Sequence, residues 1–129
     1  MTQENKELLL KDLCARLPYG VKCENYNHID GRNVFKVTDI RDSGYICGTV
    51  NNNYCWAVFD PLELKPYLFP LSSMTEKQKK EYQYITERWM YDSSYSISDS
   101  TDWLNKNHFD YRGLIEKGLA IDATGLNVY

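Results

Sequence analysis

The stretch that decides the fold runs from Val21 to Phe59 and reads VKCENYNHIDGRNVFKVTDIRDSGYICGTVNNNYCWAVF. Three runs of turn residues divide it into four strand-like segments: Asp30-Gly31, Asp42-Ser43-Gly44 and Asn51-Asn52-Asn53. Asp-Gly favours a two-residue hairpin because both turn positions need positive φ, and Asn tolerates the left-handed conformation. Connections this short make each strand antiparallel to the one before it. The sequence therefore predicts a four-stranded antiparallel meander, with strands at 21–29, 32–40, 45–50 and 54–59.

The segment 62–71 follows the breaker Asp60-Pro61 and contains Pro66 and Pro70. Proline cannot donate to a strand ladder, so these residues argue against a central strand. We expect an extended crossing segment, with Tyr67 and its apolar neighbours as anchors onto the body of the protein.

An amphipathic helix is predicted before the meander, at 4–17. Apolar residues at helical spacing form its expected stripe: Leu9, Leu10, Leu13, Cys14 and Leu17. Polar residues are expected on the opposite face: Lys6, Glu7, Lys11 and Asp12. Pro18 and Gly20 are expected to end this helix.

The C-terminal half is predicted to be mainly helical. A helix at 75–91 is expected to begin with the capping-box pattern Ser73-Met74-Thr75-Glu76 and to bury a stripe of Tyr82, Ile85 and Trp89. A further helix, capped by Asp99 or Ser100, is expected to run through Asn107. A short helix at 111–117 is expected to be capped by Asp110 and closed by Gly118. A short edge strand is expected at 119–121.

The chain has 129 residues, of which 43% are hydrophobic and 26% are charged. This length suits one compact domain, and this composition argues against a disordered chain. Because the strands and the later helices are segregated along the sequence, a parallel βαβ sheet is disfavoured. We expect a single α+β domain over residues 1–129. It has an N-terminal helix, a four-stranded antiparallel meander that can curl toward a small barrel, and a helical C-terminal half packed on the sheet.

The net charge is −3 and the isoelectric point is about 5.3. A basic surface is the usual signature of a nucleic-acid-binding protein, so this charge argues against nucleic acid as the partner. Near the N-terminus the longest apolar run is Leu8-Leu9-Leu10, far shorter than a signal-peptide core or a membrane span. We expect a cytoplasmic protein that does not enter a membrane.

Sequence motifs for common chemistries are absent. The seven glycines form neither G-x-G-x-x-G nor G-x-x-x-x-G-K-[ST], which argues against the usual nucleotide sites. The four cysteines (Cys14, Cys23, Cys47 and Cys55) are spaced too widely for a zinc knuckle, although Cys47 and Cys55 can face each other across a hairpin. Neither a cofactor nor a metal is predicted, and the thiols are expected to be reduced.

One short segment gathers residue types that catalysis uses: His108, Asp110 and Arg112. Together with Cys47 or Cys55 they could supply a nucleophile and its base, but no spacing supports this arrangement. In the structural alternative, the three side chains satisfy helix ends and pair with each other where two helices meet. They are therefore candidate catalytic residues, and a purely structural role is the alternative.

The chain also contains 11 tyrosines. Most fall in predicted strands or on the helix at 75–91, where tyrosine forms an amphipathic wall between core and water. Tyr84 and Tyr91 lie off the apolar stripe of that helix, so at least one of them is expected to be exposed. Because Tyr and Trp are enriched at binding hot spots, the candidate binding residues are Tyr67, Tyr84, Trp89 and Tyr91.

Three blocks of the sequence resemble a known group of proteins: DLCARLPYGV (12–21), KPYLFPLSSMT (65–75) and DWL (102–104) continuing to HFDYRGLIEKGLA (108–120). The group consists of uncharacterised small proteins encoded in phages, prophages and mobile elements of gut anaerobes. The resemblance covers about a third of the chain and implies a bacterial or phage intracellular context. It implies no activity and carries over no catalytic residue.

These features favour a non-enzymatic binding module of a phage or mobile element. Its aromatic-rich surface is expected to bind a protein partner or a second copy of the chain. Two alternatives stay open: a small enzyme with a site around His108, Asp110 and Arg112, and a nucleic-acid accessory protein.

Overall fold

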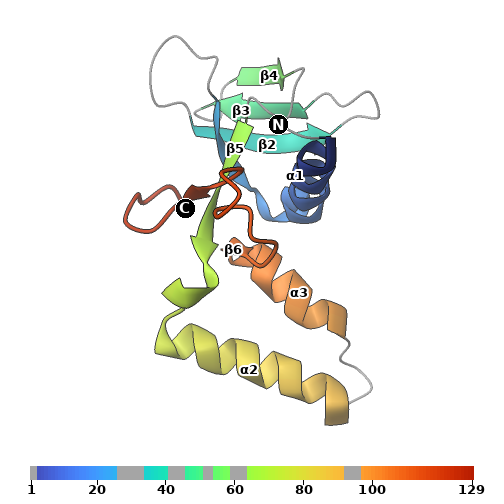
Figure 1. The fold of residues 1–129 in the computed structure, drawn as a ribbon, viewed down its shortest axis with the longest axis vertical. Helices are drawn as coiled ribbons and strands as arrows, with labels where there is room; N and C mark the ends of the chain where they lie inside the picture. Colours follow the sequence, from blue (N-terminus) through green and yellow to red (C-terminus); the bar gives the residue numbers. More distant parts are fainter. Residues whose placement is uncertain (1–2, 26–33, 41–45, 51–53, 59–63, 92–96) are drawn as a thin grey trace.

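A computed structural model of the chain describes residues 3–25, 34–40, 46–50, 54–58, 64–91 and 97–129. The predicted turns at Asp30-Gly31, Asp42-Ser43-Gly44 and Asn51-Asn52-Asn53 lie outside these residues. The described elements follow one another as α1 (Gln3–Arg16), β1 (Lys22–Asn25), β2 (Val34–Ile40), β3 (Ile46–Val50), β4 (Tyr54–Val58), β5 (Leu64–Pro70), α2 (Glu76–Tyr91), α3 (Ile97–Lys106), β6 (Phe109–Asp110) and β7 (Ile121–Asp122) (Figure 1). The protein has the predicted α+β fold.

The first four strands form the predicted meander. β1 pairs with β2, β2 with β3 and β3 with β4, and each pair is antiparallel. Among the described strands the order is β4-β3-β2-β1-β5-β6, and β7 also pairs with β5. The two outer strands of this order do not pair with each other, so the sheet is open rather than curled into a barrel.

The structure corrects the expectation for the proline-containing segment, which is the strand β5. It pairs antiparallel with β1 over Leu64–Pro66, then parallel with β7 at Tyr67 and Leu68 and with β6 at Phe69 and Pro70. Each proline occupies the last position of one of these short ladders, where the strand changes partner or ends. The missing N–H groups therefore interrupt no long ladder, which is why proline is tolerated here.

The prediction for α1 is right in extent and right for Leu9 and Leu13, which are buried, and for Leu10 and Leu17, which pack partly buried against the core, but it is wrong for Cys14 and Asp12. The buried residues are Leu9, Asp12, Leu13 and Arg16, whereas Cys14, expected in the apolar stripe, is exposed. These four positions are three or four residues apart and share one face of the helix. Asp12 was expected in solvent, but it is buried because Arg16 lies one turn further on the same face and compensates its charge.

The core lies between α1 and one face of the sheet. Its buried residues are Leu9, Leu13, Val21, Cys23, Val37, Ile46 and Leu64. A second, smaller cluster forms where β5 meets the C-terminal segment, and it contains Leu68, Leu114, Leu119 and Ala120. Gly20 makes the connection from α1 into β1 with a φ of 70°, a conformation that glycine adopts without strain.

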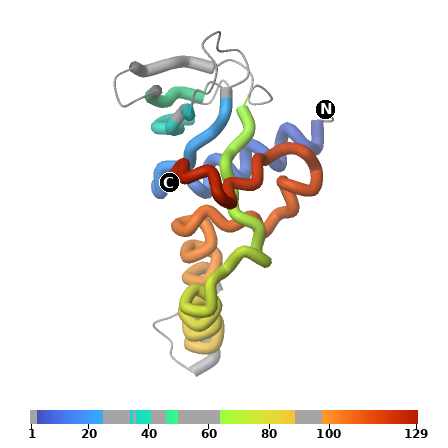
Figure 2. The backbone as a smooth tube through the Cα atoms, turned by 90° about the vertical axis from the view of Figure 1, so that its left-hand side faces the viewer, coloured from blue at the N-terminus to red at the C-terminus, as the bar shows by residue number. Residues whose placement is uncertain are grey.

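The helices α2 and α3 lie close to their predicted positions. α2 lies at the opposite end of the molecule from β4 and contacts α3, which packs against β6 and α1 (Figures 1 and 2). The capping box of α2 is formed by Thr75 and Gln78, whose backbone amides each donate to the other's side chain, at 2.9 and 3.1 Å. The predicted box at Ser73 is wrong, since the Ser73 hydroxyl donates to the carbonyl of Pro70 instead.

Two smaller predictions for the C-terminal half are also corrected. α3 begins at Ile97, so the proposed caps Asp99 and Ser100 lie inside its first turn. Residues 111–120 form turns rather than a helix, and the last strand is Ile121–Asp122 rather than 119–121. Among the helices described here, none combines the length and the apolar character needed to cross a bilayer.

Candidate functional site

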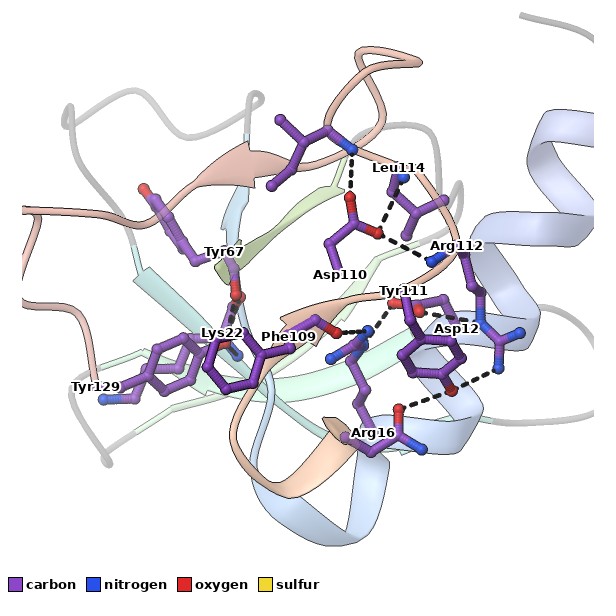
Figure 3. Close-up of polar contacts among 12 residues, drawn as sticks. Asp12, Arg16, Lys22, Tyr67, Phe109, Asp110, Tyr111, Arg112, Leu114 and Tyr129 are labelled. Atoms are coloured by element: carbon purple, nitrogen blue, oxygen red, sulfur yellow. Dashed lines mark hydrogen bonds and ion pairs between the residues drawn. The ribbon is translucent and has the colours of Figure 1, made fainter. Parts of the chain in front are cut away.

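A buried cluster of charged side chains links α1 to the segment after β6 (Figure 3). Asp12 and Arg16 lie one turn apart on α1, and both side chains are fully buried. Arg16 Nε donates to Asp12 Oδ2 at 2.8 Å, and Arg112 Nε donates to Asp12 Oδ1 at 3.1 Å. One carboxylate therefore compensates two guanidinium groups, and buried charges are tolerated only when they are paired in this way.

Tyr111 completes this group, which we call the Asp12 cluster (Asp12, Arg16, Tyr111 and Arg112). Arg112 Nη2 donates to the Tyr111 hydroxyl at 2.9 Å, and that hydroxyl donates to Asn105 Oδ1 at 3.0 Å. The two guanidinium carbons lie 5.4 Å (Arg16) and 4.7 Å (Arg112) from the centre of the Tyr111 ring, which is within cation–π range. The cluster joins segments that are far apart in sequence and so stabilises the tertiary structure.

Asp110 acts as a cap for the turns that follow it (Figure 3). Its Oδ1 accepts from the backbone amides of Arg112 and Leu114, at 3.3 and 3.0 Å, and its Oδ2 accepts from that of Ile115 at 3.0 Å. A carboxylate at this position satisfies amide donors that would otherwise be unpaired. The capping role predicted for Asp110 is confirmed, although the segment it caps is not a helix.

His108 lies at the junction of α3 and β6 in a left-handed conformation, with a φ of 62°. Its ring stacks on that of Tyr129, with 3.6 Å between the ring centres. Burial, followed by the charges of Arg16 and Lys22, lowers the pKa of His108 to about 4. The imidazole is therefore neutral near pH 7. Its Nδ1 is buried and has no hydrogen-bond partner among the described residues, so no carboxylate there orients it as a general base.

Tyr129 fastens the C-terminal segment onto the sheet. Its hydroxyl donates to the carbonyl oxygen of Tyr67 on β5 at 2.8 Å and accepts from the backbone amide of Lys22 on β1 at 2.9 Å. Burial raises the pKa of the Tyr129 hydroxyl. The residue is 41% exposed as a whole, but its hydroxyl is held between two strands. The segment that ends at Tyr129 is thus anchored to the body of the protein.

The three candidate catalytic residues share a segment but not a common centre. The carboxylate of Asp110 binds backbone amides, the guanidinium of Arg112 binds Asp12, and His108 stacks on Tyr129. The polar side chains do satisfy local backbone and buried charge, as the structural alternative expects. Asp110 does so with the amides that follow it, that of Arg112 included, whereas the side-chain partners of Arg112 and His108 include Asp12 and Tyr129, which lie outside the segment.

Cys47 and Cys55 are not placed directly opposite each other. The register places Cys47 opposite Ala57 and Cys55 opposite Thr49, so these two residues are not direct cross-strand partners. Burial and the charge of Asp12 raise the pKa of the Cys23 thiol, which disfavours the thiolate that nucleophilic attack needs. Within the described ranges, no three His, Cys, Asp or Glu side chains are grouped so as to hold a metal ion.

A second kind of site lies on the exposed side of α2. Lys77, Lys80, Tyr84 and Arg88 are exposed and three or four residues apart, so they share one side of the helix, which we call the α2 face. Tyr84 is 52% exposed, as expected for a tyrosine off the apolar stripe. The guanidinium carbon of Arg88 lies 4.7 Å from the centre of the Tyr84 ring. An aromatic ring among cations is thus presented to solvent.

A shallow groove of about 380 Å³ runs beside the α2 face and is lined by Lys80, Glu81, Tyr84, Ile85 and Trp103. Trp103 comes from α3, where its ring lies 5.5 Å from that of Tyr82. Of the other candidate binding residues, Tyr67 lies in β5 and is only 5% exposed, so it does not join this surface. The side chains of Trp89 and Tyr91 lie outside the described part of the molecule.

The sequence interpretation missed the Asp12 cluster and the anchoring of Tyr129. One signal was present, because Asp12 and Arg16 are spaced i, i+4 on the same face as Leu9 and Leu13, and this spacing favours an ion pair. No signal pointed to Arg112 as the second partner of Asp12, since the two residues are distant in sequence and only the packing of the C-terminal segment brings them together.

The fold defines an α+β protein with an open mixed sheet. No family model, no curated protein and no solved structure matches the chain. Its function is therefore inferred from its own contacts and surfaces.

Proposed function

We propose that this protein is a non-enzymatic binding module that holds an acidic segment of a partner protein on the α2 face. The observation that carries the proposal is Tyr84, a large aromatic side chain that is 52% exposed and has the Arg88 guanidinium against its ring. Tyrosine and arginine are the residue types most enriched at protein-binding hot spots, together with tryptophan.

Charge sets the chemistry of the partner. Three cations, Lys77, Lys80 and Arg88, lie on this side of α2 against one acidic residue, Glu81, which is four residues after Lys77 and three before Tyr84 and also lines the groove. Acidic side chains of a partner would meet these cations, which increases the association rate and selects against basic partners. The local positive charge stands out because the whole chain has a net charge of −3.

The groove supplies the apolar contact. Tyr84, Ile85 and Trp103 give it an apolar lining, flanked by Lys80 and Glu81. An apolar side chain of the partner that enters this groove would be removed from water, and such anchors contribute most of the binding energy at protein interfaces. We therefore expect the bound segment to combine acidic residues with at least one large apolar residue.

A protein partner is favoured over nucleic acid and over a catalytic role. Nucleic-acid sites usually carry a larger basic surface, and here Glu81 adjoins the three cations of the α2 face. For catalysis, the candidate residues are engaged in structural contacts, and the neutral His108 has no orienting carboxylate among the described residues. The α2 face, in contrast, is exposed to solvent, and none of its residues belongs to the described hydrophobic core.

The test is an array of random short peptides probed with the full chain and with Tyr84→Ala, at low and high salt. We expect the retained peptides to be acidic with a large apolar residue, to be lost with Tyr84→Ala, and to bind more weakly in high salt because exposed charges are screened. Gln83→Ala is the matched control, since Gln83 is exposed on the same helix but does not line the groove.

Three results would contradict the proposal. The first is retention of neutral or basic peptides, the second is equal binding by wild type and Tyr84→Ala, and the third is retention of single-stranded or double-stranded DNA or RNA in place of peptides. Dimerisation abolished by Tyr84→Ala in sedimentation experiments would instead identify a second copy of the chain as the occupant of the α2 face and would overturn the acidic-partner assignment.

The cellular setting is part of the same proposal. The resemblance of the blocks at 12–21, 65–75 and 102–120 supports a role in a phage, prophage or mobile element, acting in the cytoplasm of the host. Sequencing of the genes beside the coding sequence tests this. Neighbouring genes for phage structure, integration or transfer are expected, and a neighbourhood of ordinary chromosomal metabolism would contradict it.

A further inference from the structure

The sheet has a second face that α1 does not cover. Val21, just before β1, and Cys23 in β1 are buried in the core against α1, so Lys22 and Glu24 lie on the opposite face. The register continues this face across the sheet, because Lys22 is opposite Lys36 on β2, and Lys36 is opposite Thr49 on β3. Two cations and a hydroxyl are therefore aligned side by side.

A pocket of about 580 Å³ lies over this face, and we call it the sheet pocket. Lys22, Lys36 and Thr49 form its floor on the sheet, and residues 126–128 of the C-terminal segment contribute to its wall. Its volume falls in the range of about 300–1,000 Å³ that is typical of small-molecule sites. The anchoring of Tyr129 to β1 and β5 holds this wall in place.

The two lysines of the sheet pocket have different surroundings. Lys22 Nζ donates to the carbonyl of Val128 at 2.7 Å and lies 5.6 Å from the centre of the Tyr129 ring, so its position is fixed. Lys36 is exposed, and its stem passes so close to Gly20 that a Cβ added there would meet Lys36 Cε at 3.0 Å. Within the described part of the chain, neither lysine forms an ion pair.

The remaining lining is apolar except for Glu24 and Asn127. Val34, Tyr67, Ile121 and Leu126 contribute side chains to the pocket. Glu24 lies opposite Val34, two cross-strand pairs along from the two lysines and on the same face of the sheet. Its charge offsets one of the two lysines, so the lining has one net positive charge. A ligand with a single anionic group is therefore favoured over one with several, because a second anionic group would meet Glu24.

We propose that the sheet pocket binds a small amphipathic carboxylate, whose head group lies between Lys22 and Lys36 and whose apolar body lies against Val34, Ile121 and Leu126. The Thr49 hydroxyl is placed beside Lys36 to donate a further hydrogen bond to the head group. Charge-assisted hydrogen bonds of this kind are about twice as strong as neutral ones. This site is separate from the α2 face and does not depend on the function proposed for it.

The test is a titration of the full chain with octanoate, followed by amide chemical shifts in two-dimensional NMR, with octanol and octylamine as matched neutral and cationic probes. We expect octanoate to bind more tightly than either, with shifts confined to β1, β2, β3, β5 and residues 121–128. Binding of octanol as tight as that of octanoate, tighter binding of octylamine, or the absence of these shifts at millimolar octanoate would overturn the proposal.

Variants distinguish the contribution of the Lys36 charge to binding from that of the pocket volume. Lys36→Met keeps the methylene stem and removes the charge, and it should weaken octanoate binding by about tenfold or more while leaving octanol binding unchanged. Lys79→Met, a matched loss of an exposed lysine on α2, should change neither. Thr49→Trp fills the pocket and should abolish binding of both probes, with a dispersed amide spectrum as the check that the variant folds. Equal effects of Lys36→Met and Lys79→Met would contradict the assignment.

Discussion

The Asp12 cluster and the exposed surface of α2 use the same kinds of residue in opposite environments. In the cluster, Asp12 and Arg16 are fully buried and each charge has a partner. On α2, the pair between Lys79 and Glu76 spans 3.3 Å with side chains that are 55% and 85% exposed. Water compensates the exposed charges when a partner is lost, whereas nothing compensates the buried ones. The comparison teaches that charge in this protein is buried and paired where α1 meets the C-terminal segment, and is exposed to solvent on α2.

The largest expected effect comes from breaking the buried side of this comparison. Asp12→Ala removes the one carboxylate that Arg16 and Arg112 share, and leaves two guanidinium groups uncompensated. We expect a loss of about 3–5 kcal/mol in the free energy of unfolding, measured by urea denaturation. Glu76→Ala, the loss of an exposed carboxylate, is the matched control and should change it by less than about 0.5 kcal/mol. Equal stability of the two variants would show that the cluster does not hold the fold.

A smaller effect is expected from the cap beside the cluster. Asp110→Ala leaves the amides of Arg112, Leu114 and Ile115 without their acceptor. We expect a loss of about 1–3 kcal/mol in the free energy of unfolding, because buried donors without partners are costly. Hydrogen exchange should show faster exchange at the amides of 114 and 115. Unchanged protection there would rule out the capping role.

The pH dependence of stability extends the comparison to a further titratable group. His108 is kept neutral by its surroundings in the folded protein. Its pKa is about 4 in the folded state and about 6.5 when unfolded. Only the unfolded chain takes up the proton between these values, so stability falls as the pH is lowered from about 6.5 to about 4. Allowing for the partial exposure of the ring, we expect a loss of about 1–2 kcal/mol from this group.

The histidine effect is tested by urea denaturation at a series of pH values. His108→Asn should flatten the profile in this window, and Asn tolerates the left-handed conformation found at this position. Substitution of the other histidine, His28→Asn, is the control. If the two variants have the same pH profile, His108 is not the group responsible.

The smallest expected effects on stability are at the exposed residues of α2. Lys79→Ala should reduce the free energy of unfolding by no more than about 0.5 kcal/mol, because the ion pair with Glu76 is exposed. Tyr84→Ala should be similarly mild in thermal unfolding while removing peptide binding. A large destabilisation by Tyr84→Ala would mean that the ring supports the fold and would weaken its assignment as a binding residue.

Local signals were enough to predict much of the fold. The short turn sequences between apolar segments indicated an antiparallel meander, and β1 to β4 form one. Helical spacing and flanking breakers placed α1 and α2 to within a residue or so, because these elements depend on interactions between near neighbours in sequence. The exposure of Tyr84 also followed from its position on the helix.

The candidate site was harder to predict. His108, Asp110 and Arg112 were singled out by residue type, but residue type alone does not say which side chain meets which. The acceptor for Arg112 is on α1, and the ring that stacks on His108 belongs to Tyr129. The proline segment was misjudged for a related reason, since only the packing of β1, β6 and β7 shows that each ladder ends at a proline.

The sequence by itself therefore determined the elements, their order and the antiparallel pairing of the first four strands, because short connections and periodicity act locally. The tertiary structure decided that Asp12 and Arg16 are buried together with the apolar residues of α1, which carboxylate serves Arg112 and where the sheet leaves a pocket. The physical reason is the same in each case. Burying a charge or leaving a face open depends on partners far away in the chain, and their positions are set only when the whole protein has packed.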